Sequence, residues 1–398
     1  MVRLAYFVSH PIQYQAPLLR RIAADPDIDL EVSFYSDFSL KAYKDPGFGK
    51  SIKWDVPLTE GYGHQFLDCW GSKQQRSWYQ QPIAKDIRKY LKQGQFDAVW
   101  VHGWSWLCSL QAILAAENLG IPILLRGESN GVKETAHPAK KIAKQTFLNW
   151  LFPKIAGFLY IGTMNRQFYQ SYGINEERLF HVPYAVDNDY FGQQAADSRA
   201  NQQKLRQSLN LEPGRPIILY AAKLIEVKRP QDLLAAYQLL SPDGVQEPEP
   251  YLLFVGDGAL RPELEEKAKA TGWNSIRFLG FRNQSEIPAM YDLCDVFVLP
   301  SSFEPWGLAI NEVMNAGKAV VVSDQVGCAP DLVLEGQNGR IFPVGDIKAL
   351  ALAMQWGICN RIEAGEVSRK HIQNWSFEED LCRLKTALNQ VKIKAMVD

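Results

Sequence analysis

The sequence predicts an α/β protein built from two doubly wound parallel sheets, one in each half of the chain. Two observations lead to this prediction. Short apolar runs typical of buried strands alternate with helical segments along most of the chain, which is the order found in parallel sheets with helices on both faces. A chain of 398 residues is also too long for one ordinary hydrophobic core, so we expect two domains.

The composition is that of an ordinary globular enzyme. Hydrophobic residues make up 46% and charged residues 22% of the chain, and the net charge of −1 gives no reason to expect a nucleic-acid partner. The six cysteines include no C-x-x-C pair, which favours reduced thiols in the cytosol over a disulfide framework or a zinc site. The N-terminal residues lack the long apolar region of a signal peptide, and no stretch reaches the roughly 20 apolar residues of a membrane span. We therefore expect a cytoplasmic protein.

The first half opens with a strand, a polar loop, a helix and a second strand. The apolar run 4–8 predicts the first strand, apolar residues at helical spacing from 17 to 23 predict the helix, and residues 30–34 predict the second strand. Ligands of doubly wound sheets bind beyond the carboxyl ends of the strands, so His10 and Gln13 in the first loop fall on the functional edge. For His10 two interpretations stay open: it orders its own loop, or it contacts a ligand.

Two later strands of this half also end in polar residues. The run 96–101 ends at His102, and the run 121–125 ends at Arg126 and Glu128. Their position after strand ends makes these three side chains candidates for a ligand site. The alternative for the last two is a local ion pair, which is the commoner fate of an arginine and a glutamate so close in sequence.

Two segments of the first half allow two interpretations each. Residues 38–80 show no clean periodicity, and they form either part of a functional site or a surface insertion with a small hairpin. Residues 133–154 contain a basic helix with aromatic residues. That helix either has an ordinary solvated lysine face or lies on an anionic membrane surface.

The strand–helix alternation begins again in the second half, so we expect a domain 1–190, a domain 191–374 and a last helix within 375–398. The loop after the first strand of this half holds Lys223 and Lys228. Two lysines five residues apart on such a loop can reach a diphosphate from two sides, and their charges would stabilise a departing nucleotide. The alternative is that both are ordinary exposed lysines.

The stretch 301–312, SSFEPWGLAINE, is the strongest site candidate. It follows an apolar strand and passes through a turn at Gly307 into a helix. This arrangement brings backbone N–H groups and the positive end of a helix to one point, which suits an anion such as phosphate. Glu304 and Glu312 flank the turn, and one can face a ligand while the other accepts hydrogen bonds from ribose hydroxyls. Alternatively, Glu304 caps the helix and Glu312 is solvated.

Two short motifs argue against other chemistries. The glycine turn at Gly256 resembles only half of G-x-G-x-x-G, because Arg261 occupies the third glycine position, and this argues against a dinucleotide redox site. Residues 187–189 formally match D-x-D, a metal–diphosphate signature, but they lie in the turn between the expected domains. We interpret them as loop residues and predict no metal.

The second half resembles the retaining glycosyltransferases of family 4, within the glycosyl transferases group 1. Glu304 and Glu312 have the E-x7-E spacing of that family. The loop lysines resemble its Gly-Arg-Leu…Glu-Lys-Gly motif, in which Lys228 matches the lysine and Lys223 stands where arginine is usual. The resemblance covers residues 157–385 well and is looser before them.

The resemblance implies a GT-B fold, in which two doubly wound domains face each other across a cleft and the last helix crosses back to the first domain. It implies transfer of a sugar, with retention, from a nucleotide diphosphate sugar to a glycan or lipid-linked acceptor. Neither a metal nor a cofactor nor a protein nucleophile is implied. The implied setting is bacterial polysaccharide assembly at the inner face of the membrane.

The resemblance also implies roles for particular residues. Glu304 would orient the sugar, and Lys223 and Lys228 would act on the leaving diphosphate. The implied donor-binding residues are Trp306, Gly307, Leu308, Glu312, Gly256, Gly280, Phe281 and Arg282. The first domain would hold the acceptor, with His10, Gln13, His102, Arg126 and Glu128 as the candidate residues and the segment 38–80 as a possible part of the site.

Two rival functions stay open. A nucleotide-sugar epimerase of GT-B shape would need no acceptor. A protein that binds nucleotide sugars without turnover is the other rival. It is kept open by two departures from the family, Glu128 in place of a histidine and Lys223 in place of an arginine.

Overall fold

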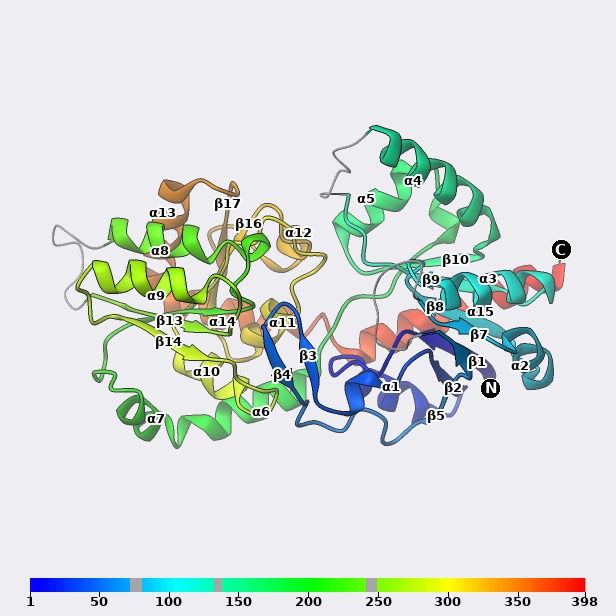
Figure 1. Ribbon diagram of the computed structural model, residues 1–398, viewed down its shortest axis with the longest axis horizontal. Helices are drawn as coiled ribbons and strands as arrows, with labels where there is room; N and C mark the ends of the chain where they lie inside the picture. Colours follow the sequence, from blue (N-terminus) through cyan, green and yellow to red (C-terminus); the bar gives the residue numbers. More distant parts are fainter. Residues whose placement is uncertain (72–80, 132–137, 241–248, 398) are drawn as a thin grey trace. The chain divides into compact units, whose positions relative to one another are not determined.

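The computed structural model of the protein describes residues 1–71, 81–131, 138–240 and 249–397. Parts of two segments interpreted above, residues 72–80 and 133–137, lie outside the described residues. The chain folds into two compact units, each with its own parallel sheet (Figure 1). Unit 1 comprises residues 1–43, 56–184 and 377–398, and unit 2 comprises residues 44–55 and 185–376. The predicted α/β fold with two doubly wound sheets is confirmed, while the boundaries at 190 and 374 stay predictions.

The sheet of unit 1 has seven strands in the order β11-β10-β9-β8-β1-β2-β5. All neighbouring strands run parallel. The strands are β1 Val2–Val8, β2 Ile28–Phe34, β5 Gly63–Phe66, β8 Ala98–His102, β9 Ile123–Arg126, β10 Gly157–Tyr160 and β11 Leu179–His181. The other elements of the unit are α1 Ala16–Ala23, η1 Phe38–Leu40, β6 Cys69–Trp70, β7 Ile83–Ala84, α2 Ile87–Gly94, α3 Leu107–Asn118, α4 Pro138–Leu151, η3 Phe152–Lys154, α5 Thr163–Ser171, η4 Glu176–Arg178 and α15 Phe377–Val397.

The sheet of unit 2 has six strands in the order β14-β13-β12-β15-β16-β17, again all parallel. The strands are β12 Ile217–Ala221, β13 Tyr251–Val255, β14 Ile276–Gly280, β15 Val296–Leu299, β16 Ala319–Ser323 and β17 Gly339–Phe342. The helices are α6 Asn188–Arg199, α7 Gln202–Ser208, η5 Glu226–Lys228, α8 Pro230–Leu240, α9 Arg261–Ala270, α10 Ile287–Leu293, α11 Leu308–Asn315, α12 Ala329–Leu332, α13 Ile347–Cys359 and α14 Arg361–Ile372.

The central strands of both sheets are continuous apolar runs because helices cover both of their faces. In β1 the five residues from Leu4 to Val8 are buried, and in β15 all four residues are buried. The apolar runs that the sequence shows are therefore core strands, and each fixes where the following loop begins.

The strand order gives each sheet one point where the chain changes direction. In unit 1 the chain runs outward from β1 through β2 to β5, and β8 then pairs with the other edge of β1. In unit 2 it runs from β12 through β13 to β14, and β15 then pairs with the other edge of β12. Ligands of doubly wound sheets bind at such points, so the loops after β1 and β8 and the loops after β12 and β15 are the candidate site loops.

One segment of the first half of the sequence belongs to the second unit. Residues 44–55 form most of the β3–β4 hairpin, with β3 at Tyr43–Asp45 and β4 at Lys50–Ile52 (Figure 1). A small hairpin is thus present in the segment 38–80, as its second interpretation expected. Its place in unit 2 was not predicted.

Candidate active site

The turn before α11 has the conformation that the sequence pattern predicts. Gly307 is the N-cap of α11 and has a φ of 103°, in the left-handed region that favours glycine. The Trp306 ring is buried, and its Nε1 donates a hydrogen bond of 2.9 Å to Asn311 Oδ1. Because the Trp306 side chain packs in the core, its backbone and not its ring can contact a ligand at the helix N-terminus.

Lys228 and Glu304 come together from two different loops of unit 2. Lys228 lies in η5 after β12, Glu304 follows β15, and Lys228 Nζ donates to Glu304 Oε2. The two side chains are only 18% and 17% exposed. Lys228 is therefore not the ordinary exposed lysine of the alternative.

Glu312 lies on α11 and is partly buried rather than fully solvated. The Tyr291 hydroxyl of α10 donates a hydrogen bond of 2.7 Å to its Oε2. Burial raises the pKa of Glu312 to about 7, although hydrogen bonds from Tyr291 and Gln284 act in the opposite direction. This carboxyl group therefore changes its charge near neutral pH.

Lys223, the other predicted lysine, has a carboxylate partner as well. Its Nζ lies 2.9 Å from Asp45 Oδ1, and Asp45 belongs to the β3–β4 hairpin. Lys223 is 32% exposed and Asp45 is 7% exposed. Both lysines predicted to act on a diphosphate are thus held by carboxylates, and neither is the freely solvated lysine of the alternative.

The glycine turn after β13 allows two loops to approach closely. A Cβ atom at Gly256 would lie 2.0 Å from the carbonyl oxygen of Ala222, and one at Gly258 would lie 2.4 Å from that of Leu224. Both atoms belong to the loop that carries Lys223. Gly256 therefore packs against the lysine loop itself, and a larger residue there would displace that loop.

The end of β14 lies beside the same hairpin. The Gly280 carbonyl accepts a hydrogen bond of 2.8 Å from the Gly256 amide. The Phe281 ring lies 5.0 Å from the ring of Phe48 in the hairpin, measured between centroids. Arg282 pairs with Glu286 at 3.0 Å. The structure therefore gathers the predicted residues of unit 2 at the carboxyl ends of β12, β13, β14 and β15.

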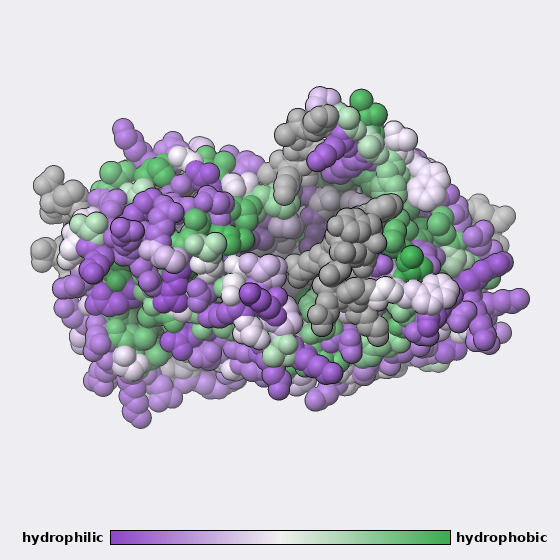
Figure 2. Space-filling model, viewed as in Figure 1, coloured by the Kyte–Doolittle hydropathy of each residue, from purple (hydrophilic) through white to green (hydrophobic). Residues whose placement is uncertain are grey.

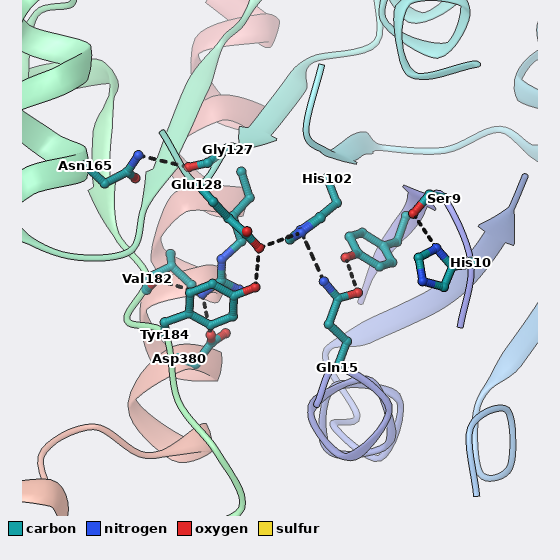
Figure 3. A network of polar contacts seen from close by, with 12 residues as sticks. Ser9, His10, Gln15, His102, Gly127, Glu128, Asn165, Val182, Tyr184 and Asp380 are labelled. Carbon is teal, nitrogen blue, oxygen red and sulfur yellow. Dashed lines mark hydrogen bonds and ion pairs between the residues drawn. The ribbon is translucent and has the colours of Figure 1, made fainter. Parts of the chain in front are cut away.

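Unit 1 holds a polar network at the corresponding edge of its own sheet (Figure 3). His102 Nε2 lies 3.2 Å from Glu128 Oε1 and 3.1 Å from Gln15 Nε2. The Tyr184 hydroxyl also donates to Glu128 Oε1, and the Tyr6 hydroxyl donates to Gln15 Oε1 at 3.0 Å. The two predicted residues His102 and Glu128 thus meet in space.

The ionisation of Glu128 follows from this network. Burial by itself would raise the pKa of Glu128, but the hydrogen bonds from His102 and Tyr184 and the nearby positive charge of Arg126 outweigh it. The pKa therefore lies below its ordinary value. Because 32% of the side chain is still exposed, Glu128 is an ionised acceptor that a ligand can reach.

Arg126 makes contacts in the core that the sequence did not predict. The side chain is 2% exposed, and its ion pair is with Asp380 of α15 at 3.1 Å, not with Glu128. The same Nη2 donates to the carbonyls of Val182 and Pro183 at 2.9 and 3.0 Å. The expected local ion pair was wrong because the side chain points into the core and ties α15 to the strand ends.

The two remaining predicted residues lie in the loop after β1. His10 Nδ1 lies 2.8 Å from Ser9 Oγ, and its ring lies 4.3 Å from that of Phe38, contacts that order the loop. Gln13 is partly buried and is not part of the network, in which Gln15 stands instead. The sequence did not lead us to Gln15, although a polar residue next to the first apolar position of a helix could have indicated a functional side chain.

Over the described ranges, no cluster of three or more His, Cys, Asp or Glu side chains is arranged to hold a metal ion. Among the helices that the structure describes, none is both long enough and apolar enough to cross a membrane.

The second half of the chain is similar to known proteins. Residues 201–374 match the family described as glycosyl transferases group 1. The chain is 29% identical over 168 residues to alpha-D-kanosaminyltransferase of Streptomyces kanamyceticus, covering 42% of each chain. It is 30% identical over 177 residues to sulfoquinovosyl transferase SQD2 of Arabidopsis thaliana, covering 44% of this chain and 31% of the relative. The chain thus spans less than half the length of these relatives.

A solved structure matches almost the whole chain. Anabaena HepE in complex with UDP has a TM-score of 0.72 and 18% identity, over 98% of this chain and all of the other. The fold is therefore that of the GT-B glycosyltransferases, with two Rossmann-like units. The segment 201–374 is thus similar to the glycosyl transferases group 1.

Proposed function

We propose that the protein is a retaining glycosyltransferase that moves a sugar from a nucleotide diphosphate sugar to a glycan or lipid-linked acceptor. The observation that supports this most is the Lys228–Glu304 pair at the carboxyl ends of β12 and β15, beside the N-terminus of α11. A helix N-terminus with an adjacent lysine favours a diphosphate, and a carboxylate beside it can hold sugar hydroxyls.

The proposed reaction needs charge stabilisation more than it needs a nucleophile. The bond between the sugar C1 and the phosphate oxygen breaks, and the acceptor oxygen bonds to C1 on the same face. The acceptor hydroxyl proton passes to the leaving phosphate. Lys223, Lys228 and the amides at the start of α11 stabilise the diphosphate as its charge grows, and Glu304 orients the sugar. Glu312 accepts hydrogen bonds from the ribose. No metal or cofactor takes part in this scheme.

The acceptor side of the proposal rests on the network of unit 1. Glu128 is ionised, partly exposed and fixed by His102 and Tyr184. A carboxylate fixed in this way can accept hydrogen bonds from the hydroxyls of a glycan. We therefore assign Glu128 and His102 to the acceptor rather than to the donor.

Helix α4 supports contact with a membrane that carries a lipid-linked acceptor. Ile142 is 67% exposed and Trp150 47% exposed, and Lys140 and Lys141 are exposed on the same helix. Figure 2 shows hydrophobic and hydrophilic residues mixed over this part of unit 1. Exposed apolar side chains beside lysines favour an anionic lipid surface. We propose that the protein acts at the inner face of a bacterial membrane.

Co-sedimentation with lipid vesicles tests this contact. Vesicles containing anionic phosphatidylglycerol should carry the protein down, and neutral vesicles should not. The double change Lys140→Glu with Lys141→Glu should abolish binding, whereas the matched change Lys267→Glu with Lys269→Glu on α9 should not. Equal binding to both kinds of vesicle, or none, would count against the membrane contact.

Thermal unfolding with nucleotides tests the donor class. UDP is the first probe because HepE was solved with it, and GDP and ADP are the comparisons. A nucleotide that binds only the folded protein raises its melting temperature. Lys228→Ala and Glu312→Ala should lose that response. If none of the three nucleotides stabilises the protein at saturating concentration, the nucleotide-sugar proposal fails.

Activity assays separate the proposal from its rivals. A transferase consumes nucleotide sugar only in step with an acceptor, apart from slow hydrolysis. An epimerase would convert the donor with no acceptor present, and a protein that only binds would show nucleotide-dependent stabilisation but no Glu304-dependent turnover.

A further inference from the structure

The β3–β4 hairpin covers the carboxyl edge of the sheet in unit 2. Residues of segment 44–55 reach the loops after three strands. Lys50 Nζ lies 2.9 Å from Asp257 Oδ2 after β13. The Lys53 carbonyl accepts a hydrogen bond of 2.7 Å from Asn283 Nδ2 after β14. Asp45 makes the third contact, with Lys223 in the loop after β12.

The hairpin encloses the Lys223 side chain. Lys223 Nζ lies 2.9 Å and 3.1 Å from the two carboxylate oxygens of Asp45 and 4.8 Å from the centroid of the Phe48 ring. The stem of the lysine passes over Gly47, where a Cβ atom would lie 2.6 Å from Lys223 Cδ. A carboxylate, an aromatic face and a bare backbone therefore hold the ammonium group in one place.

Asp45 is itself rigidly held. Its Oδ1 accepts hydrogen bonds from the amides of Gly47 at 2.8 Å and Phe48 at 3.1 Å. Burial by itself would raise the pKa of Asp45, but the hydrogen bonds from Lys223 and the two amides outweigh it and lower the pKa. The carboxylate therefore stays ionised near neutral pH and forms a fixed anchor for the lysine.

Lysine at this position needs such an anchor. An arginine presents a planar fork of donors, whereas a lysine is a point charge on a flexible four-carbon stem. Ordering that stem on binding costs conformational entropy, unless contacts within the protein already hold it in place. We propose that Asp45 and Gly47 are positioning residues of the donor site, and that the hairpin holds Lys223 ready to bind the diphosphate of the donor. This inference rests on the proposed function.

A rival account of the same contacts makes the opposite prediction. Asp45 would then be a substitute anion that neutralises Lys223 until the donor displaces it. Removing its charge would tighten diphosphate binding under that account, and would weaken it under ours. Gly47→Ala separates the two accounts further, because it displaces the lysine stem and leaves the carboxylate in place.

The test is calorimetric titration of the full-length protein with the nucleoside diphosphate that stabilises it, UDP being the first probe. Asp45→Asn and Gly47→Ala should each raise the dissociation constant about tenfold, comparable to the loss of one charge-assisted hydrogen bond. In the Lys223→Ala background Asp45→Asn should have no further effect, because the lysine that it positions is gone. If Asp45→Asn acted through a general loss of structure, its effect on the dissociation constant would instead add to that of Lys223→Ala.

The controls make each outcome decisive. Asp68→Asn removes a carboxylate from an exposed lysine pair of unit 1 and should leave nucleotide affinity unchanged. Melting temperatures without ligand show which variants are folded. If Asp45→Asn is not folded, Gly47→Ala tests the inference by itself. Tighter binding by Asp45→Asn, or wild-type affinity in both hairpin variants, overturns the inference and leaves the proposed function standing. A wild-type protein that binds no nucleotide but is folded overturns both.

Discussion

At the scale of single residues, the site consists of charged groups whose partners fix their ionisation. Lys228 is paired with Glu304, and Lys223 with Asp45. Glu312 differs from them because it accepts hydrogen bonds from the Tyr291 hydroxyl and the Gln284 side chain, neither of which is a cation. Burial without a cation leaves its carboxyl group with a pKa of about 7. The sequence identified Glu312 by its spacing from Glu304. Its raised pKa depends on burial, and the spacing gives no information on burial.

The pKa of Glu312 predicts how nucleotide affinity depends on pH. An ionised carboxylate accepts hydrogen bonds from two ribose hydroxyls, and a protonated one accepts them less well. Affinity should therefore rise as pH increases from about 5.5 through 7 and level off above about 8. Calorimetric titration across this range measures it. Glu312→Gln should remove this component and leave only the pH dependence of the phosphate, so identical profiles for both proteins would contradict the assignment.

At the scale of elements, the C-terminal helix α15 is joined to the sheet of unit 1 through a buried ion pair between Asp380 and Arg126. Asp380 is fully buried, and burial raises its pKa to about 6 despite the opposing effect of Arg126. The guanidinium of Arg126 also holds the backbone at Val182 and Pro183. This arginine thus joins the end of β9, the chain after β11 and the last helix. Its contacts therefore hold these three elements together.

Breaking this pair should destabilise unit 1 strongly. Asp380→Ala leaves the Arg126 charge buried without its partner, and the expected loss is about 3–5 kcal/mol of unfolding free energy. Glu379→Ala is the matched control, because it removes an exposed partner of Arg383 on the same helix and should cost about 1 kcal/mol or less. Chemical denaturation measures both, and similar small losses in the two variants would contradict the anchoring role.

At the scale of the whole molecule, sequence order and structural unit do not coincide. The chain leaves unit 1 after Tyr43, contributes residues 44–55 to unit 2 and returns at Val56. It changes unit again at Tyr184 and at Ser376. The site of unit 2 therefore contains residues from both halves of the sequence.

Hydrogen exchange of the full protein tests this composition of the site. A saturating nucleoside diphosphate should slow amide exchange in the loops after β12, β13 and β15, because binding suppresses local opening. The segment 44–55 should become protected along with them, although it lies in the first half of the chain. Mass spectrometry of peptides measures both regions. Protection confined to peptides beyond residue 185 would contradict a role for the hairpin in donor binding.

The sequence by itself determined the α/β fold with two parallel sheets and the candidate lysines and glutamates of unit 2. Apolar runs, glycine turns and the spacing of Glu304 and Glu312 are local properties, and local properties are sufficient to define strands, turns and helix starts. Strand ends then gather at one edge of a sheet, so His102 and Glu128 could be expected near each other.

Only the tertiary structure decided which charged groups meet. Asp45 and Lys223 are 178 residues apart, and Arg126 and Asp380 are 254 residues apart. No local pattern links such pairs, because their contact depends on how distant elements pack and on which side chains become buried. The sequence therefore predicted the positions of the site residues, while packing determined their partners and their ionisation.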